Sequence, residues 1–208
     1  MWVPNHSPYF ASKITFTKPS VAPAALAQPE PVAAGQPEPA AASQPEPPAA
    51  GQPAPPLLGS VPVRVDIPSI GTHAQVVPLG EDDDGTMAAP ADPDTVGWYE
   101  LGVGVGTPGN ALLDGHVDWG GRLRVFGLLR QLRPGDTFQI TDSDGNILSY
   151  SVTWTRLYEA DNAPLDEIFQ QTADEEVTLI TCGGAFDPSA HMYVSRWVVR
   201  GVRTPSAD

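Results

Sequence analysis

The only cysteine of the chain, Cys182, is the residue best suited to covalent chemistry. It follows an apolar run that predicts a strand over 176–181, and two glycines come after it. A side chain at the end of a strand is well presented, and glycines let a substrate approach the backbone. A thiol at its ordinary pKa is mostly protonated at neutral pH, so fast reaction needs a nearby base or cation. Cys182 is a candidate nucleophile, and a small buried apolar residue is the alternative.

Four histidines could supply the base, and His116 has the most favourable position. It follows the apolar run 110–114, which predicts a short buried strand that would hold the imidazole rigidly. The others lie in the N-terminal region, in a predicted turn and in a predicted loop: His6, His73 and His191. We therefore expect His116 to exchange protons at the site.

Arg196 is the candidate for stabilising the transition state. It lies near the start of the last apolar run, 193–202, which predicts the final strand. A planar guanidinium suits the oxyanion that forms when a thiolate attacks an amide carbonyl. Arg200 shares the same face by the period of two and competes for this role. For either arginine, the alternative is a surface charge that limits pairing at a sheet edge.

Short apolar runs separated by turn residues predict an all-β fold. Alternation over 61–67 would place Val61, Val63, Val65 and Ile67 on one strand face. The other predicted strands cover 74–79, 110–114, 137–141, 147–159, 176–181 and 193–202. Residues 123–132 have helical spacing, 162–172 fit a loop with one helical turn, and the rings of 96–99 are expected to pack on the barrel. The pattern favours a closed β-barrel of about eight strands with one or two short helices.

The first 57 residues have a different composition. Gln-Pro-Glu-Pro recurs at 28–31, 36–39 and 44–47, and Gln-Pro-Ala-Pro follows at 52–55. Alternate prolines fix φ and remove amide donors, which predicts a disordered, extended spacer. We therefore divide the chain into a Pro/Ala/Gln/Glu-rich spacer over 1–57 and a catalytic domain over 58–208. A docking site for a proline-reading partner is the alternative for the spacer.

Charge and composition exclude several classes of function. With 25 acidic and 11 basic residues, the chain has a net charge of −14 and should repel nucleic acid. One cysteine excludes an internal disulfide and a metal site built on several cysteines, and the acidic run 81–85 lacks the spacing of a calcium loop. We expect no metal and no cofactor. No segment reaches the roughly 18 apolar residues of a membrane span, so we expect no anchor within the chain as given.

The surroundings of the three candidates resemble the motifs of the sortases. These are Gly-His-Val-Asp at 115–118, Leu-Ile-Thr-Cys-Gly-Gly at 179–184 and Arg-Trp-Val-Val at 196–199, in this order. The resemblance spans about 61–202. The stretch 181–187 looks most like the actinobacterial class F, with class E as a neighbour. Class F members often have Asn where this chain has Arg196, which fits other classes better.

The resemblance implies a sortase-type β-barrel that acts as a cysteine transpeptidase on a sorting signal similar to Leu-Pro-x-Thr-Gly. Cys182 would form a thioacyl enzyme, His116 would protonate the leaving amine and activate the incoming one, and Arg196 would support the oxyanion. Thr181 and Gly183 would lie beside the bound peptide. The implied partners are the sorting signal of a surface protein and an amine of the cell wall. The implied location is outside the cytoplasm, at the surface of a Gram-positive bacterium, and the implied state is a monomer.

Several alternatives stay open at the level of sequence. A sortase-fold hydrolase would share every motif, and a non-catalytic secreted β-barrel that binds peptides would bury an inert Cys182. A papain-like enzyme fits poorly, because its cysteine precedes its histidine and lies on a helix. Asp118, two residues after His116, is a candidate for orienting the imidazole or for holding the nearby loop.

Overall fold

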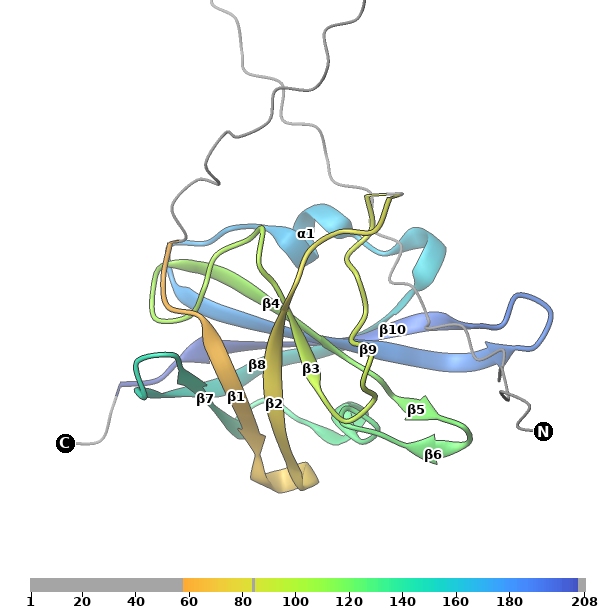
Figure 1. The fold of residues 1–208 in the computed structure, drawn as a ribbon, viewed down its shortest axis with the longest axis horizontal. Helices are drawn as coiled ribbons and strands as arrows, with labels where there is room; N and C mark the ends of the chain where they lie inside the picture. Colours follow the sequence, from red (N-terminus) through yellow and green to blue (C-terminus); the bar gives the residue numbers. More distant parts are fainter. Residues whose placement is uncertain (1–57, 84, 206–208) are drawn as a thin grey trace, which may run out of the picture. The chain divides into compact units, whose positions relative to one another are not determined.

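A closed barrel of eight strands forms the described part of the protein (Figure 1). The computed structural model describes residues 58–83 and 85–205, so the predicted spacer over 1–57 lies outside the described residues. Around the barrel the strand order is β1-β2-β3-β4-β9-β10-β8-β7. The predicted all-β barrel of about eight strands is confirmed, and the helical elements within the described ranges are short.

The barrel strands are joined mostly by antiparallel pairing, but β2 pairs with β3 and β4 pairs with β9 in parallel. The strands are β1 (Pro62–Ile67), β2 (Thr72–Leu79), β3 (Val96–Tyr99), β4 (Gly109–Gly115), β7 (Thr137–Asp142), β8 (Ile147–Glu159), β9 (Glu175–Asp187) and β10 (Met192–Arg203). A separate two-stranded sheet consists of β5 (Asp118–Trp119) and β6 (Arg122–Leu123). The helical elements are α1 (Leu165–Phe169) and the 3-10 turns η1 (Pro68–Ile70), η2 (Leu129–Gln131) and η3 (Ala160–Asn162).

The barrel separates two apolar clusters because successive strand residues point to opposite faces. The large cluster fills the interior and includes Val177 and Leu179 of β9, with the rings of Phe138 and Tyr150 stacked at 5.3 Å. A small cluster on the outer face contains Ile180 of β9 together with Val198 and Ile168. The outer face of β9 is therefore covered around Ile180, and α1 supplies part of the cover.

Two predictions about local structure are wrong. Val63 is 38% exposed, because the register between β1 and β7 shifts between Pro62 and Arg64 and breaks the alternation. The helix over 123–132 does not form, although its apolar spacing brings Phe126, Leu129 and Leu132 into the core. Gly127 turns so tightly there that a Cβ atom would lie 2.7 Å from the Cβ of Leu123.

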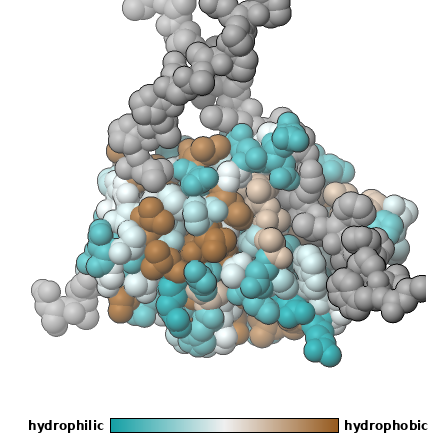
Figure 2. Space-filling view, viewed as in Figure 1, coloured by the Kyte–Doolittle hydropathy of each residue, from teal (hydrophilic) through white to brown (hydrophobic). Residues whose placement is uncertain are grey.

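The predicted strands and helical turn elsewhere are found, and 96–99 forms the strand β3, whose Trp98 packs into the barrel core. The β9–β10 pair continues beyond the barrel as a projecting hairpin, at the right of Figure 1. Figure 2 shows the face that carries β1 to β3, where an apolar patch over β1 and β2 is bordered by hydrophilic residues. No candidate site residue lies on β1 or β2, so this patch is separate from the site. Among the residues the structure describes, no helix is both long enough and apolar enough to cross a membrane.

Candidate active site

The three candidate residues lie in one row across neighbouring strands. Strand β9 lies between β4 and β10, and Cys182 of β9 is the direct partner of Arg196 on β10. On the other side, β4 and β9 pair in parallel as far as Asp114 opposite Ile180. His116 comes two residues after Asp114 and Cys182 two residues after Ile180, so the two residues lie level with each other. Adjacent strands lie about 4.8 Å apart, so the backbone of the row spans about 10 Å.

The hydroxyl of Thr181 holds this end of β4 against β9. Thr181 is buried, and its Oγ1 donates a hydrogen bond of 2.6 Å to the carbonyl of Gly115. This bond continues the pairing of the two strands beyond Asp114 and fixes the residue before His116. The position of Thr181 therefore supports the alignment of the row, whereas its predicted contact with substrate stays a prediction.

Cys182 faces the outside of the barrel. It lies two residues after Ile180 of the outer cluster and therefore on the same face of β9, whereas Leu179 of the interior core lies on the other face. The side chain is nevertheless only 6% exposed. An outward-facing but covered thiol can be shielded from water and still react when a substrate displaces the cover.

The expectation that β9 ends before the cysteine is wrong. The strand continues to Asp187, because β10 pairs with it as far as Asp187 opposite Met192. Gly184 has a positive φ of 75° at an irregularity of this pairing, so the glycine bends the hairpin without ending it. Packing explains why residue 183 is a glycine, because a Cβ atom there would lie 2.6 Å from Cδ1 of Trp197. The predicted contact of Gly183 with substrate stays a prediction.

His116 is oriented by a backbone carbonyl. Its Nε2 lies 2.8 Å from the carbonyl oxygen of Pro90, and a carbonyl only accepts hydrogen bonds. Nε2 therefore carries a proton, which leaves Nδ1 as the nitrogen that can gain or lose one. The ring also packs edge-on against Trp119 with centroids 5.2 Å apart. These contacts hold the imidazole in one orientation at the end of β4.

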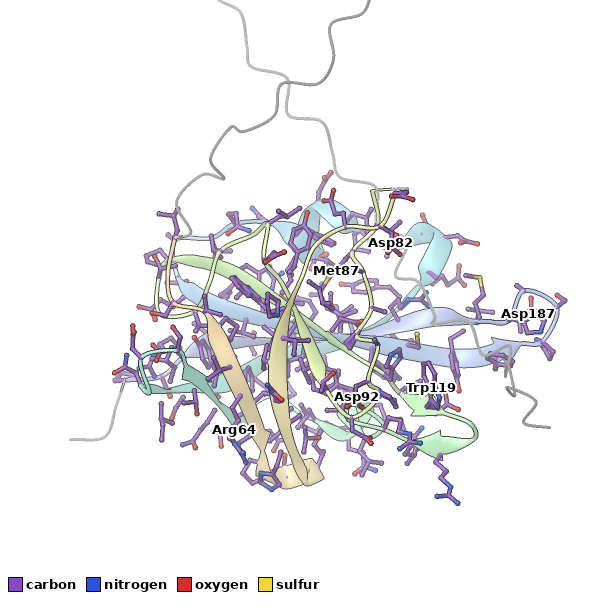
Figure 3. The ribbon with its side chains drawn as sticks, viewed as in Figure 1. Arg64, Asp82, Met87, Asp92, Trp119 and Asp187 are labelled. Carbon is purple, nitrogen blue, oxygen red and sulfur yellow. The ribbon has the colours of Figure 1, made fainter. Side chains whose placement is uncertain are left out.

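Asp118 holds the loop and not the imidazole. Its Oδ1 accepts a hydrogen bond of 3.0 Å from the hydroxyl of Tyr193, which ties β5 to β10. Figure 3 shows Trp119 on β5 next to this region, whereas Asp187 lies at the far tip of the hairpin. Of the two roles predicted for Asp118, its contacts fit the holding of the loop and not the orienting of the imidazole.

Tyr193 is a site residue that the sequence did not reveal. Its main-chain carbonyl accepts a hydrogen bond of 2.9 Å from Nη1 of Arg196. Burial, the bond to Asp118 and the nearby Cys182 raise the pKa of its phenol to about 12. The phenol is therefore neutral at physiological pH and acts as a donor. The only signal in the sequence was an aromatic residue in the same run as Arg196, and no spacing rule links it to Asp118.

The tie between Tyr193 and Asp118 should control access to the sulfur. A hydrogen bond to a charged group is worth about 1.5–3 kcal/mol. Without it, β5 should separate from β10 about tenfold more often. We expect Tyr193→Phe to raise the rate of Cys182 alkylation by iodoacetamide about tenfold. Tyr99→Phe is the matched control, since its hydroxyl also bonds a carboxylate, that of Glu81, on another strand. Equal alkylation rates for the wild-type protein and Tyr193→Phe would show that the tie does not limit access.

Arg196 is a buried cation beside the thiol. It is 2% exposed, and its Nη1 donates to the carbonyls of Tyr193 and Ser195, each at 2.9 Å. A guanidinium stays charged at any physiological pH, so it brings a fixed positive charge to a buried position. Such a charge next to Cys182 can stabilise a thiolate and the oxyanion formed by its attack.

Arg200, the competing candidate, has a different task. Its Nη1 lies 3.5 Å from a carboxylate oxygen of Glu176, and its Nε donates to Oγ1 of Thr178 at 3.1 Å. Its Nη2 donates to two carbonyls of α1, those of Glu167 at 3.0 Å and Ile168 at 2.8 Å. Arg200 therefore anchors α1 on the outer face of the sheet, four residue pairs along β10 from the pair that Arg196 forms with Cys182.

Replacing Arg200 should damage the fold more than the chemistry. Breaking a buried ion pair leaves an uncompensated charge, which costs about 3 kcal/mol or more. We expect Arg200→Met to lower the free energy of unfolding by about that amount in urea. Arg156→Met is the control, because Arg156 pairs with Glu167 of the same helix from an exposed position and should matter little. Similar losses in both variants would contradict the anchoring role.

Comparison with known protein families and with solved structures points to one family. A family model described as Sortase domain matches residues 65–204. A search of curated protein sequences finds no match.

Solved structures of sortases share the fold. A lid mutant of sortase A from Corynebacterium diphtheriae is 21% identical with a TM-score of 0.54, covering 69% of this chain and 70% of that chain. Sortase C-1 from Actinomyces oris is 23% identical with a TM-score of 0.52, covering 68% and 73%. Streptococcus agalactiae sortase C1 in complex with MTSET is 22% identical with a TM-score of 0.56, covering 72% and 71%. At these identities the likeness concerns the fold.

Proposed function

We propose, because the chain belongs to the sortase family, that it is a cysteine transpeptidase acting on a sorting signal similar to Leu-Pro-x-Thr-Gly. It would join the cleaved surface protein to an amine of the cell wall. The observation that carries the proposal is the row formed by Arg196, its cross-strand partner Cys182, and His116 at the end of the neighbouring strand β4. A nucleophile, a proton carrier and a fixed cation in adjacent positions are the groups that acyl transfer requires.

In the first half of the reaction, the thiolate of Cys182 attacks the carbonyl carbon of the threonine in the signal. A carbon–sulfur bond forms, and the carbonyl oxygen becomes an oxyanion beside the guanidinium of Arg196. When the carbon–nitrogen bond to the following glycine breaks, Nδ1 of His116 gives its proton to the leaving amine. The carboxyl end of the substrate remains attached to the enzyme as a thioester.

In the second half, an incoming amine attacks the thioester. His116, now neutral at Nδ1, takes the proton that the amine loses as the new amide bond forms. The thiolate of Cys182 leaves, and the imidazolium returns to the state that began the cycle. Water in place of the amine would give a free carboxylate, which is the outcome of the sortase-fold hydrolase considered as the alternative.

The decisive experiment is cleavage of peptides of the Leu-Pro-x-Thr-Gly type, followed by mass spectrometry with and without triglycine or diaminopimelate as acceptor. Transpeptidation predicts a product whose mass contains the acceptor. A free carboxylate in the presence of acceptor would support the hydrolase instead. No cleavage, together with slow alkylation of Cys182, would support a non-catalytic peptide-binding barrel.

The proposed setting follows from the same chemistry. An enzyme whose acceptor belongs to the cell wall works outside the cytoplasm, at the surface of a Gram-positive bacterium. One chain contains the whole row, so a monomer suffices for activity. Fractionation of cells that express the native protein would test the location, and light scattering would test the monomer.

A further inference from the structure

Two segments hold His116, one by its ring and the other by its backbone. The loop 88–95, which leads into β3, holds the ring, because the carbonyl oxygen of Pro90 lies 2.8 Å from Nε2. The turn 124–127, which follows β6, holds the backbone, because the amide of Phe126 donates to the carbonyl of His116 at 3.0 Å. The orientation of the imidazole therefore depends on how the loop and the turn lie relative to each other.

The turn 124–127 is fixed to the end of β4. The amide of Arg124 donates to the carbonyl of Val117 at 3.1 Å, one residue beyond the histidine. Phe126 is fully buried and packs on Gly115, where a Cβ atom would lie 2.7 Å from Cδ2 of the ring. The turn therefore moves with the backbone of β4, and a side chain that reaches from it to the loop can hold the loop in place.

Arg124 is the side chain that joins the turn to the loop. Its Nη1 lies 3.2 Å from Oδ2 and 3.4 Å from Oδ1 of Asp94. Asp94 is in turn fixed within the loop, since its amide donates to Oδ1 of Asp92 at 2.9 Å. A second link, from the amide of Val125 to the carbonyl of Pro93, is longer, at 3.5 Å. The ion pair is the shorter link and the charged one, so it should contribute more.

We propose that Arg124 is a positioning residue for His116. Its ion pair with Asp94 keeps the loop in place, so that the carbonyl of Pro90 stays bound to Nε2 of the imidazole. Nδ1 is thereby kept for the proton that passes to the leaving amine and from the incoming one. Arg124 acts through the loop and the histidine, without touching substrate. The kinetic part of this inference rests on the proposed function, whereas the hydrogen bond itself does not.

The expected effect is moderate, because the ion pair is partly exposed. The side chain of Arg124 is 26% exposed and that of Asp94 is 66% exposed. Pairs of this kind change an equilibrium by a factor of about five at most. Here that factor acts on one hydrogen bond of His116. We therefore expect loss of the pair to open this bond about three- to fivefold more often and to leave the melting temperature nearly unchanged.

Exchange of the Nε2 proton with water tests the ion pair without any substrate. A proton bound to a carbonyl is protected and exchanges when the hydrogen bond opens. In proton NMR, the ring signal of His116 is identified by its absence from His116→Gln. It should exchange about three- to fivefold faster in Arg124→Gln, and equally in Asp94→Asn, than in wild type. Equal rates for the wild-type protein and both variants would overturn the proposal.

Three further variants test whether the two side chains act as a pair. The double variant Arg124→Gln/Asp94→Asn should exchange no faster than either single variant, because each single change already breaks the ion pair. Arg124→Lys should restore part of the protection, since it keeps the charge without the planar fork. Asp66→Asn is the matched control: on β1 it breaks an exposed pair with Arg64 at 2.8 Å and a contact with His73 at 2.7 Å, and it should not change the exchange. Single effects that multiply in the double variant would contradict the pairing.

Peptide cleavage tests the kinetic part. With a Leu-Pro-Ala-Thr-Gly peptide, Arg124→Gln should lower kcat about three- to fivefold and leave KM unchanged, because proton transfer by His116 belongs to the chemical step. Asp66→Asn should leave both constants unchanged. Faster exchange with an unchanged kcat would overturn the positioning role. If the wild-type protein cleaves no peptide, the proposed function fails, while the exchange rates still decide whether the ion pair holds the hydrogen bond of the histidine.

Discussion

Replacing Cys182 with alanine should abolish peptide cleavage and transpeptidation, to the rate of the uncatalysed reaction. The thioacyl intermediate needs sulfur as nucleophile, and no second cysteine exists in the chain to replace it. The fold should survive, because alanine keeps the Cβ atom and the side chain lies on the outer face beside Ile180 rather than in the barrel core. Melting temperature and circular dichroism check the fold, and peptide mass spectrometry checks the loss.

A trapping experiment makes this prediction sharper. In wild-type protein, the intermediate should add the mass of the acyl part of the peptide to the intact chain when acceptor is withheld. The adduct should be absent from Cys182→Ala and should disappear from wild type on addition of triglycine. Turnover that persists in Cys182→Ala would refute the mechanism.

Replacing Arg196 with alanine should lower kcat by about 10²–10³, the usual cost of removing one group that stabilises an oxyanion. The loss should fall mainly on kcat, since the interaction is strongest when negative charge develops on the oxygen. Arg196→Lys should restore only part of it, because an ammonium lacks the planar fork that bonds to carbonyls and oxyanion together. Steady-state kinetics with the same peptide measures both variants.

The control for Arg196 is Arg203, on the same strand and outside the row. Its Nη1 donates to the carbonyl of Ser149 at 3.1 Å, at the far end of β10. Arg203→Ala should keep kcat within about threefold of wild type, since rate falls tenfold only per 1.4 kcal/mol of lost transition-state stabilisation. A comparable loss in both variants would mean that strand packing, rather than the charge beside Cys182, limits the reaction.

The candidate site residues could be nominated because residue type and strand position were both visible in the sequence. A lone cysteine after an apolar run, a histidine after another and an arginine in the last run were sufficient to nominate Cys182, His116 and Arg196. The count of strands was sufficient to predict a closed barrel. These inferences depend on local alternation and on motif order, which the chain carries without any tertiary contact.

The sequence could not choose between partners that lie far apart along the chain. Asp118 is two residues from His116, yet its hydrogen bond comes from Tyr193, and His116 bonds the carbonyl of Pro90 instead. Arg196 and Arg200 share a face of β10 by periodicity. Their roles differ because of the neighbouring elements, since Arg200 is bound by Glu176 and by a carbonyl of α1. Such choices depend on strand register and loop paths, which local patterns do not specify.

By itself, then, the sequence determined the candidate residues, the family they resemble and the barrel type, since composition, order and alternation are properties of the chain. Tertiary structure decided that three neighbouring strands align these residues in one row, that 123–132 turns instead of forming a helix, and that Arg200 rather than Arg196 anchors α1. The physical reason is that register, burial and electrostatic environment arise only when distant segments pack together.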